Sequence, residues 1–164
     1  MTAKPARLRE RETSDEDEEE EEHDDQSLAD MLQELRVLLQ GTQVLTAFLI
    51  ILPFNQGFGQ IDEAEKWVYL ATFVSSLTAL VFFTAPAAQH RLARPIVHRE
   101  RFKNFATRMM VIGLVPLSVS LVLSSQLVVS QVFGVAPSLV VAGIVLVLIA
   151  VVWWVLPLAR KEEM

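Results

Sequence analysis

Four long apolar stretches alternate with short polar connections along this chain. A helix rises about 1.5 Å per residue, so about 20 mostly apolar residues cross a hydrocarbon core of about 30 Å. The pattern predicts transmembrane helices over residues 37–54, 67–86, 107–129 and 137–157. We therefore expect an all-α membrane protein, an antiparallel four-helix transmembrane bundle with a disordered acidic N-terminal arm.

The polar flanks of these stretches divide the chain into three parts. We expect a disordered acidic cytoplasmic arm at 1–26, a four-helix transmembrane domain at 27–159 and a cytoplasmic tail at 160–164. From Asp15 to Asp25, ten of eleven residues are acidic. Such a tract buries too little apolar surface to offset its chain entropy, and its like charges extend it. The first helix is expected to start near Ser27, where Ser27 and Asp30 resemble a capping box.

A polar stripe runs along the first predicted span. Gln33, Arg36, Gln40 and Gln43 recur at spacings of three, four and three, which places them on one side of a helix. An amide in hydrocarbon is costly unless it is paired, so we expect the stripe to face other helices or a water-filled crevice. Gly41, beside the stripe, would let a neighbouring backbone approach. Helix packing and a polar pathway open to the cytoplasm both remain possible roles.

Small residues in the second span predict close helix packing. Ala71, Ser75 and Ala79 form one row, and Thr72 with Ser76 forms the adjacent row. Such rows let two helix backbones approach each other within a membrane. The fourth span has few small residues, so we expect it to expose the largest area to lipid.

Composition excludes an ordinary soluble domain. The chain has 164 residues, of which 52% are hydrophobic, and a net charge of −6. Soluble domains carry charge on about a quarter of their residues, whereas residues 109–159 contain no Asp, Glu, Lys or Arg. Residues 1–30 hold 13 acids and 4 bases, which leaves 7 acids and 10 bases for the rest. The N-terminal part is therefore acidic and the transmembrane part is basic.

Lysine and arginine positions predict the orientation. If both termini and the loop 87–104 face the cytoplasm, 13 of the 14 bases lie on that side and only Lys66 lies on the other. The positive-inside rule favours this arrangement. We expect a multi-pass protein of the cell (plasma) membrane with both termini cytoplasmic.

The loop between the second and third spans concentrates basic residues. Each base near an anionic leaflet contributes about 1 kcal/mol of attraction, so we expect the loop to bind anionic headgroups of the lipid bilayer or a protein partner. Nucleic acid is not expected. The candidate residues of this basic loop are Arg91, Arg94, Arg99, Arg101, Lys103 and Arg108.

Catalytic and metal-binding residues are not evident. The chain has no cysteine, and the serines of the spans have no intramembrane histidine or acid to activate them. His90 and His98 have no carboxylate or thiol at ligand spacing. We expect no enzymatic activity, no cofactor and no metal.

Residues 31–37, followed by 40–45, 48–49 and 52–54, resemble the opening signature of a family of small membrane proteins from actinobacteria. Domain catalogues list it as the domain-of-unknown-function family six-three-two-eight. Ala85-Pro86 and His90-Arg91 resemble that family's second-span exit. The resemblance covers residues 28 to about 157 and implies a four-span body with no assigned activity. Some members carry an automatic label of sodium:proton antiporter.

Two functions stay open from the sequence. The favoured one is a structural or regulatory/interaction protein of the cytoplasmic membrane, with a homo-oligomer or a membrane partner. The alternative is a component of a small-ion (cation/proton) transporter or channel. A proton-coupled antiporter ordinarily holds an ionisable group within the membrane, and these four spans offer none, which favours the first function.

Overall fold

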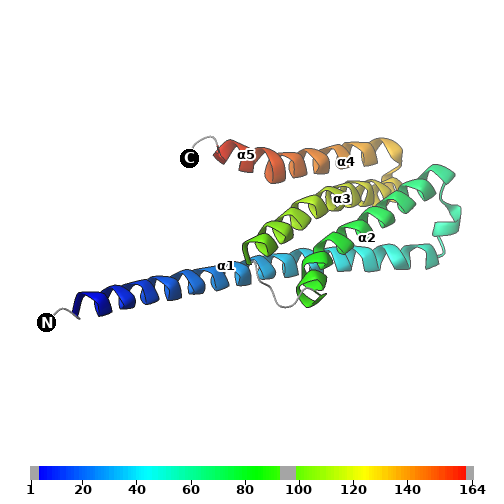
Figure 1. Cartoon of the computed structure of the whole chain (residues 1–164). Helices are drawn as coiled ribbons and strands as arrows, with labels where there is room; N and C mark the ends of the chain where they lie inside the picture. Colours follow the sequence, from blue (N-terminus) through cyan, green and yellow to red (C-terminus); the bar gives the residue numbers. More distant parts are fainter. Residues whose placement is uncertain (1–3, 93–98, 162–164) are drawn as a thin grey trace. The chain divides into compact units, whose positions relative to one another are not determined.

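A computed structural model describes residues 4–92 and 99–161, and it gives side chains for most positions between 26 and 159. The chain forms two compact units, Met1–Val37 and Leu38–Met164. We call the described part of the second unit the body. The helices in chain order are α1 (Lys4–Ile51), η1 (Leu52–Phe54), η2 (Phe58–Gln60), α2 (Glu63–Leu92), α3 (Arg99–Phe133), α4 (Val135–Ile149), η3 (Ala150–Val155) and α5 (Leu156–Lys161) (Figure 1).

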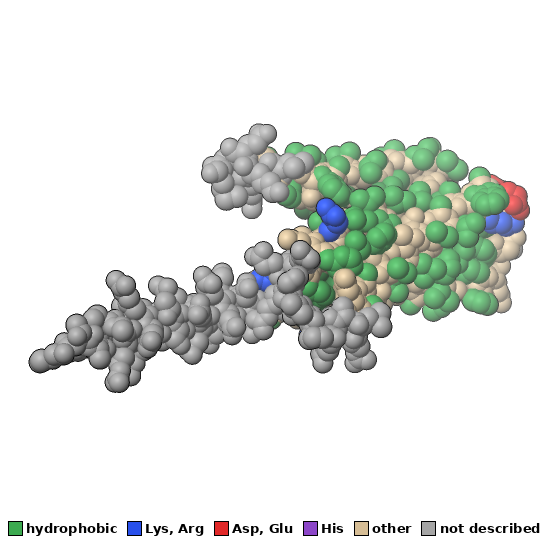
Figure 2. All heavy atoms as spheres, in the orientation of Figure 1, with side chains coloured by type: hydrophobic (Ala, Val, Ile, Leu, Met, Phe, Trp, Pro, Cys, Tyr) green, Lys and Arg blue, Asp and Glu red, His purple; other side chains and the backbone are tan. Residues whose placement is uncertain are grey.

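The predicted fold class is confirmed. Four helical segments are long and apolar enough to cross a membrane: Ala29–Phe54, Glu63–Gln89, Phe102–Phe133 and Val135–Val155. No strand occurs in the part of the chain that the structure describes. Figure 2 shows hydrophobic side chains over most of the visible face of the body, with charged side chains gathered at its ends. The chain is therefore a multi-pass all-α membrane protein.

The first helix starts much earlier than expected. The backbone of α1 is helical from Lys4, so Ser27 lies inside the helix and does not cap it. No proline or glycine interrupts the chain between Pro5 and Gly41, and glutamate is a good helix former. This segment therefore contains no residue that would end the helix. Disorder of the acidic arm in solution stays a prediction.

Residues at heptad spacing pack α2 against α3. The most deeply buried residues of α2 are Thr72, Ser76, Ala79, Phe83 and Pro86. Steps of three and four residues keep such positions on one face, as in left-handed helix pairs. Of the two predicted small-residue rows, the one with Thr72 and Ser76 is buried, whereas Ala71 is exposed. Ala79 lies with the buried face because it follows Thr72 by seven residues.

A connection of one residue joins α3 to α4. Gly134, at φ 84° and ψ −179°, is the only residue between the two helices. α4 packs against α3 through Ser138, Ala142 and Ile149, and it makes no contact with α2 within the described residues. Of the most apolar stretch of this span, only 11% is buried, whereas 22% of the corresponding stretch is buried in α2 and in α3. The prediction that the fourth span exposes the largest area is confirmed.

The fourth span ends in a wider helix. Residues Ala150–Val155 form a π-helix, and Pro157 follows in α5. A proline ring collides with the carbonyl four residues before it, here that of Trp153. A π-helical turn opens the backbone at that point and so accommodates the ring.

Candidate functional site

Two amides of the predicted stripe, Gln40 and Gln43, point away from the rest of the body. Gln40 and Gln43 are exposed and make no hydrogen bond to any described residue. Gln33 and Arg36, farther toward the N-terminus of α1, are exposed as well. The glutamines of the stripe are therefore not buried in the described structure, and a contact of the stripe with another helix or a water-filled crevice stays a prediction.

Threonines occupy the buried side of α1 in their place. Thr42 is 1% exposed and Thr46 is 6% exposed. The Thr42 hydroxyl donates to the carbonyl of Leu38 at 2.8 Å, and the Thr46 hydroxyl donates to the carbonyl of Thr42 at 2.8 Å. A threonine can thus satisfy its one proton on its own helix, whereas a glutamine has two N–H groups and a carbonyl to satisfy. The buried threonines are therefore satisfied without a polar partner from another helix.

Hydroxyls also link α1, α2 and α3 to one another. The Thr46 and Ser76 oxygens lie 2.5 Å apart, and because Thr46 already donates to a backbone carbonyl, Ser76 is the donor. The Ser120 hydroxyl donates to the carbonyl of Thr72 at 3.1 Å. No buried side-chain N or O atom of the described residues lacks a hydrogen-bond partner. This cluster therefore acts as polar packing between helices.

The exposed side of α1 is open around a glycine. A Cβ atom added at Gly41 would meet nothing within 4 Å. The close approach of a neighbouring backbone that the sequence suggested is therefore not made by the described residues of the body. Val44, one turn further, is 58% exposed. We call Gln40, Gly41, Gln43 and Val44 the amide face.

The amide face lies deep within the candidate span. Gln43 precedes Phe54, the end of the span, by eleven residues. At about 1.5 Å per residue this separation is about 16 Å, close to half of a hydrocarbon core of about 30 Å. Gln43 is therefore near the bilayer midplane, and Gln40 is one turn away from it.

Among the candidate residues of the basic loop, the structure describes side chains only at the C-terminal side of the loop. Arg94 lies outside the described residues, and the side chains of Arg91, Arg99 and Arg101 lie outside the described side chains. Lys103 is half-buried and Arg108 is exposed, both on α3. Lipid or partner binding by this loop stays a prediction.

A carboxylate that the sequence did not single out joins α2 to α3. The Ser130 hydroxyl has two acceptors for its one proton, an oxygen of Glu65 at 2.8 Å and the carbonyl of Leu127 at 2.9 Å. Gln131 donates its amide to the other oxygen of Glu65 at 2.7 Å. We call Glu65, Ser130 and Gln131 the Glu65 clamp. Because Glu65 begins α2 and the other two end α3, the clamp holds together the helix ends beside the α1–α2 connection. No sequence spacing indicates a contact between residues 65 positions apart.

Glu65→Ala should destabilise the body because it removes both acceptors of the clamp. Hydrogen bonds to a charged group contribute about 1.5–3 kcal/mol, and exposure of Gln131 reduces this, so we expect a loss of about 1 kcal/mol. SDS titration of the purified protein measures the free energy of unfolding. Glu63→Ala is the matched control, since Glu63 is 81% exposed and pairs with Lys66 of its own helix. Equal losses in the two variants would contradict the clamp.

The described residues include no group of three His, Asp or Glu side chains placed to hold a metal ion. The absence of metals and cofactors stays a prediction.

Comparison with known proteins gives one match. Residues 17–157 match the model of a family described as a family of unknown function, DUF6328. The match begins at Asp17, eleven residues before the predicted start at residue 28, and so includes part of the acidic tract. No curated protein and no solved structure matches the chain.

Proposed function

Since this chain belongs to the DUF6328 family, whose function is unknown, we propose that it is a structural or interaction protein of the cytoplasmic membrane. It acts by contact between helices and not by catalysis. The observation that carries this proposal is the amide face, where Gln40 and Gln43 are exposed without hydrogen bonds to the described residues.

The physical reason is the cost of an unpaired amide in lipid. Hydrocarbon offers no donor or acceptor to the N–H and C=O groups of a glutamine. A hydrogen bond between transmembrane helices contributes about 1–2 kcal/mol in model peptides, and glutamines are among the side chains that form such bonds. Two amides one turn apart therefore favour a neighbouring helix over lipid at this face.

A second copy of the chain is the partner that this chemistry favours. An amide carries donors and an acceptor, so identical residues satisfy each other across a two-fold axis. Gly41 follows Gln40 on the exposed side of α1 and leaves the backbone uncovered there, which allows a second helix to come close. A homodimer through α1 meets both conditions.

Single cysteines test this contact directly, because the chain has none of its own. We expect Val44→Cys to form a disulfide-linked dimer on oxidation in membranes. Adding Gln40→Leu and Gln43→Leu removes the interhelical hydrogen bonds, and it should weaken dimerisation at least about tenfold, equivalent to about 1.4 kcal/mol. Dimer yield on a non-reducing gel against protein density in the membrane is the measurement.

The matched control is Val147→Cys on α4. Val147 is 60% exposed, close to the 58% of Val44, and belongs to another helix. Equal crosslinking of the two cysteines, or an unchanged yield in the double leucine variant, would refute an interface at the amide face. Exclusive crosslinking to a different protein would replace the homodimer with a membrane partner.

We also propose that both termini are cytoplasmic and that the membrane is the plasma membrane. Within the described side chains of the body, Lys103 and Arg108 lie near the start of α3, and Lys66 lies near the opposite end of the bundle. The positive-inside rule places the two bases in the cytoplasm. A membrane-impermeant maleimide should label Gly59→Cys on intact cells and leave Asn104→Cys unlabelled, and the reverse pattern would invert the topology.

The transport alternative receives less support. The hydroxyls of Thr46, Ser76 and Ser120 form hydrogen bonds between helices, and they line neither of the two cavities of the body described below. A cation or proton flux in liposomes that Gln43→Leu abolishes would favour transport over contact.

A further inference from the structure

A large apolar groove lies at the surface of the body between three helices. It has a volume of about 880 Å³, and its lining residues fall within 45–55 of the first span, 121–129 of α3 and 145–149 of α4, with Thr46 and Val147 not among them. Small-molecule sites commonly have volumes of about 300–1,000 Å³ and mostly apolar linings with a few polar groups. The groove has the size and composition of such a site.

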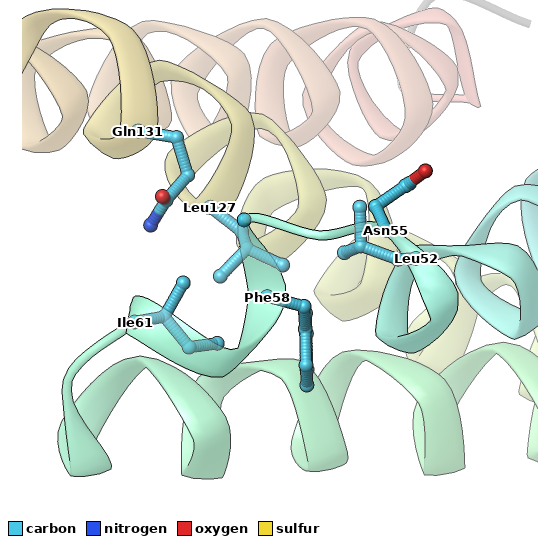
Figure 3. Close-up of a pocket in the computed structure, with 7 residues that line it drawn as sticks. Leu52, Asn55, Phe58, Ile61, Leu127 and Gln131 are labelled. Atoms are coloured by element: carbon cyan, nitrogen blue, oxygen red, sulfur yellow. The ribbon is translucent and has the colours of Figure 1, made fainter.

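A smaller pocket continues the groove beneath the α1–α2 connection. Its volume is about 180 Å³, and it shares Leu52, Asn55 and Leu127 with the groove. Figure 3 shows Phe58 and Ile61 lining the pocket from the connection, with Gln131 from α3 on its opposite side. The groove and the pocket therefore adjoin at these three residues, and we call the two together the cavity.

The length of this cavity corresponds to one leaflet. Along α3 it extends from Leu121 to Gln131, a separation of ten residues. Ten residues of helix are about 15 Å long, and one leaflet is half of a hydrocarbon core of about 30 Å. An acyl chain that lies along α3 would therefore fit the cavity from the midplane to the membrane surface.

Polar atoms lie along one side of the groove and at its loop end. Ser124 and Ser125 donate their protons to carbonyls of α3 at 3.0 and 2.7 Å, which leaves only their oxygens available to a ligand. Asn55 is exposed, and its side-chain amide makes no hydrogen bond to the described residues. The Asn55 amide can therefore bind the hydroxyl or ester group of a lipid.

The charges around the cavity select against phosphate. Neither cavity is lined by a charged residue. The carboxylate of Glu65 accepts a hydrogen bond from the lining residue Gln131 and would repel a phosphate. The lining itself offers a phospholipid headgroup no cation, whereas an uncharged headgroup needs none.

We propose that this cavity binds one acyl chain of a neutral lipid, of the diacylglycerol type, with the lipid hydroxyl or ester on Asn55. This site lies in the half of the bundle next to the α1–α2 connection. It does not depend on the contact function proposed for the amide face.

Photolabelling of the full-length protein in liposomes tests the site. The probe is a diacylglycerol with a diazirine in its acyl chain, and adducts are mapped by mass spectrometry of peptides. We expect adducts to concentrate on the lining residues of the groove, among them Phe48, Val128 and Leu148, and not on Val147. Excess unlabelled diacylglycerol should reduce these adducts about tenfold, and the same excess of phosphatidylglycerol should not.

Two substitutions from different helices fill the groove. Val128→Trp and Leu148→Trp change lining residues that are 62% and 58% exposed, so each places an indole in the cavity without replacing a buried side chain. Both should lower labelling about tenfold. Val147→Trp is the control, because Val147 is 60% exposed at a similar depth and does not line the groove. Asn55→Leu should remove the preference for diacylglycerol over phosphatidylglycerol.

Three outcomes would overturn the site. Adducts spread evenly over all exposed helix faces would show ordinary contact with bulk lipid. Equal labelling of Val147→Trp and the two groove variants would show that the cavity holds no ligand. Equal competition by phosphatidylglycerol would contradict the neutral headgroup. Thermal unfolding in detergent verifies that each variant is folded. Val128→Trp and Leu148→Trp each test occupancy of the groove, so the test remains if one of them does not fold.

Discussion

Gly113→Ala is expected to lower the free energy of unfolding by about 1–3 kcal/mol, the usual cost of an extra methyl group in a packed interior. A Cβ atom at this position would lie 2.6 Å from Cε1 and 2.9 Å from Cδ1 of Phe83, and 3.1 Å from Cβ of Phe82. The Phe83 ring is 0% exposed, so it has no free space into which to move. SDS titration of the purified protein measures the loss.

The sign of this effect is informative because helix propensity predicts the opposite. Alanine is about 1 kcal/mol more favourable than glycine inside a helix. Gly143→Ala isolates the gain in helix propensity, because Gly143 is exposed in α4 and an added Cβ would meet nothing within 4 Å. We expect Gly143→Ala to be neutral or stabilising. If Gly113→Ala behaved in the same way, close packing of α2 on α3 at this point would be wrong.

Removing the obstructing ring should restore part of the stability. In Gly113→Ala combined with Phe83→Leu, the new methyl group has more space, so the loss should be smaller than the sum of the two single losses. A coupling of this kind is typical of residues in contact. Strict additivity would show that the two positions do not touch.

Gly134→Ala is the second substitution with a large expected effect, again about 1–3 kcal/mol of lost stability. Gly134 has φ 84° and ψ −179°, a conformation that is essentially restricted to glycine. It is also the whole connection between α3 and α4, and its N–H donates to the Ser130 carbonyl at 3.0 Å. An alanine there either strains the backbone or breaks the tight reversal of the chain.

The matched control is Gly57→Ala in the other connection at the same end of the body. Gly57 has φ −74°, which any residue adopts, and a Cβ there would meet nothing within 4 Å. We expect less than about 0.5 kcal/mol of change, as for most surface substitutions. SDS titrations of both variants make the comparison, and similar losses would show that the geometry of Gly134 carries no special cost.

The membrane character of the fold follows from local sequence. Residues 109–159 carry no charge, and each of the four apolar windows is long enough to cross a bilayer. Transfer of such stretches into hydrocarbon depends on their length and composition and hardly on their neighbours. The four spans and the large lipid exposure of the fourth were therefore predictable before any helix was placed.

The polar groups show where local reasoning fails. From the sequence, Gln40 and Gln43 were as good candidates for the interior as Thr42 and Thr46, because all four repeat at helical spacing on one helix. The structure buries the threonines, whose protons reach carbonyls of their own helix, and exposes the glutamines. Periodicity alone does not distinguish the two pairs, because each pair repeats at helical spacing; the packing of α1 against α2 decides which pair is buried.

Sequence alone determined that this chain is helical, crosses a membrane several times and belongs among four-span proteins, because those properties arise within one helix at a time. Tertiary structure alone decided which face of each helix is buried, which residues form the Glu65 clamp, and where the groove between α1, α3 and α4 opens. Those features depend on the register and rotation of one helix against another. They are set by side chains distant in sequence, such as Gly113 against Phe83, that no local pattern connects.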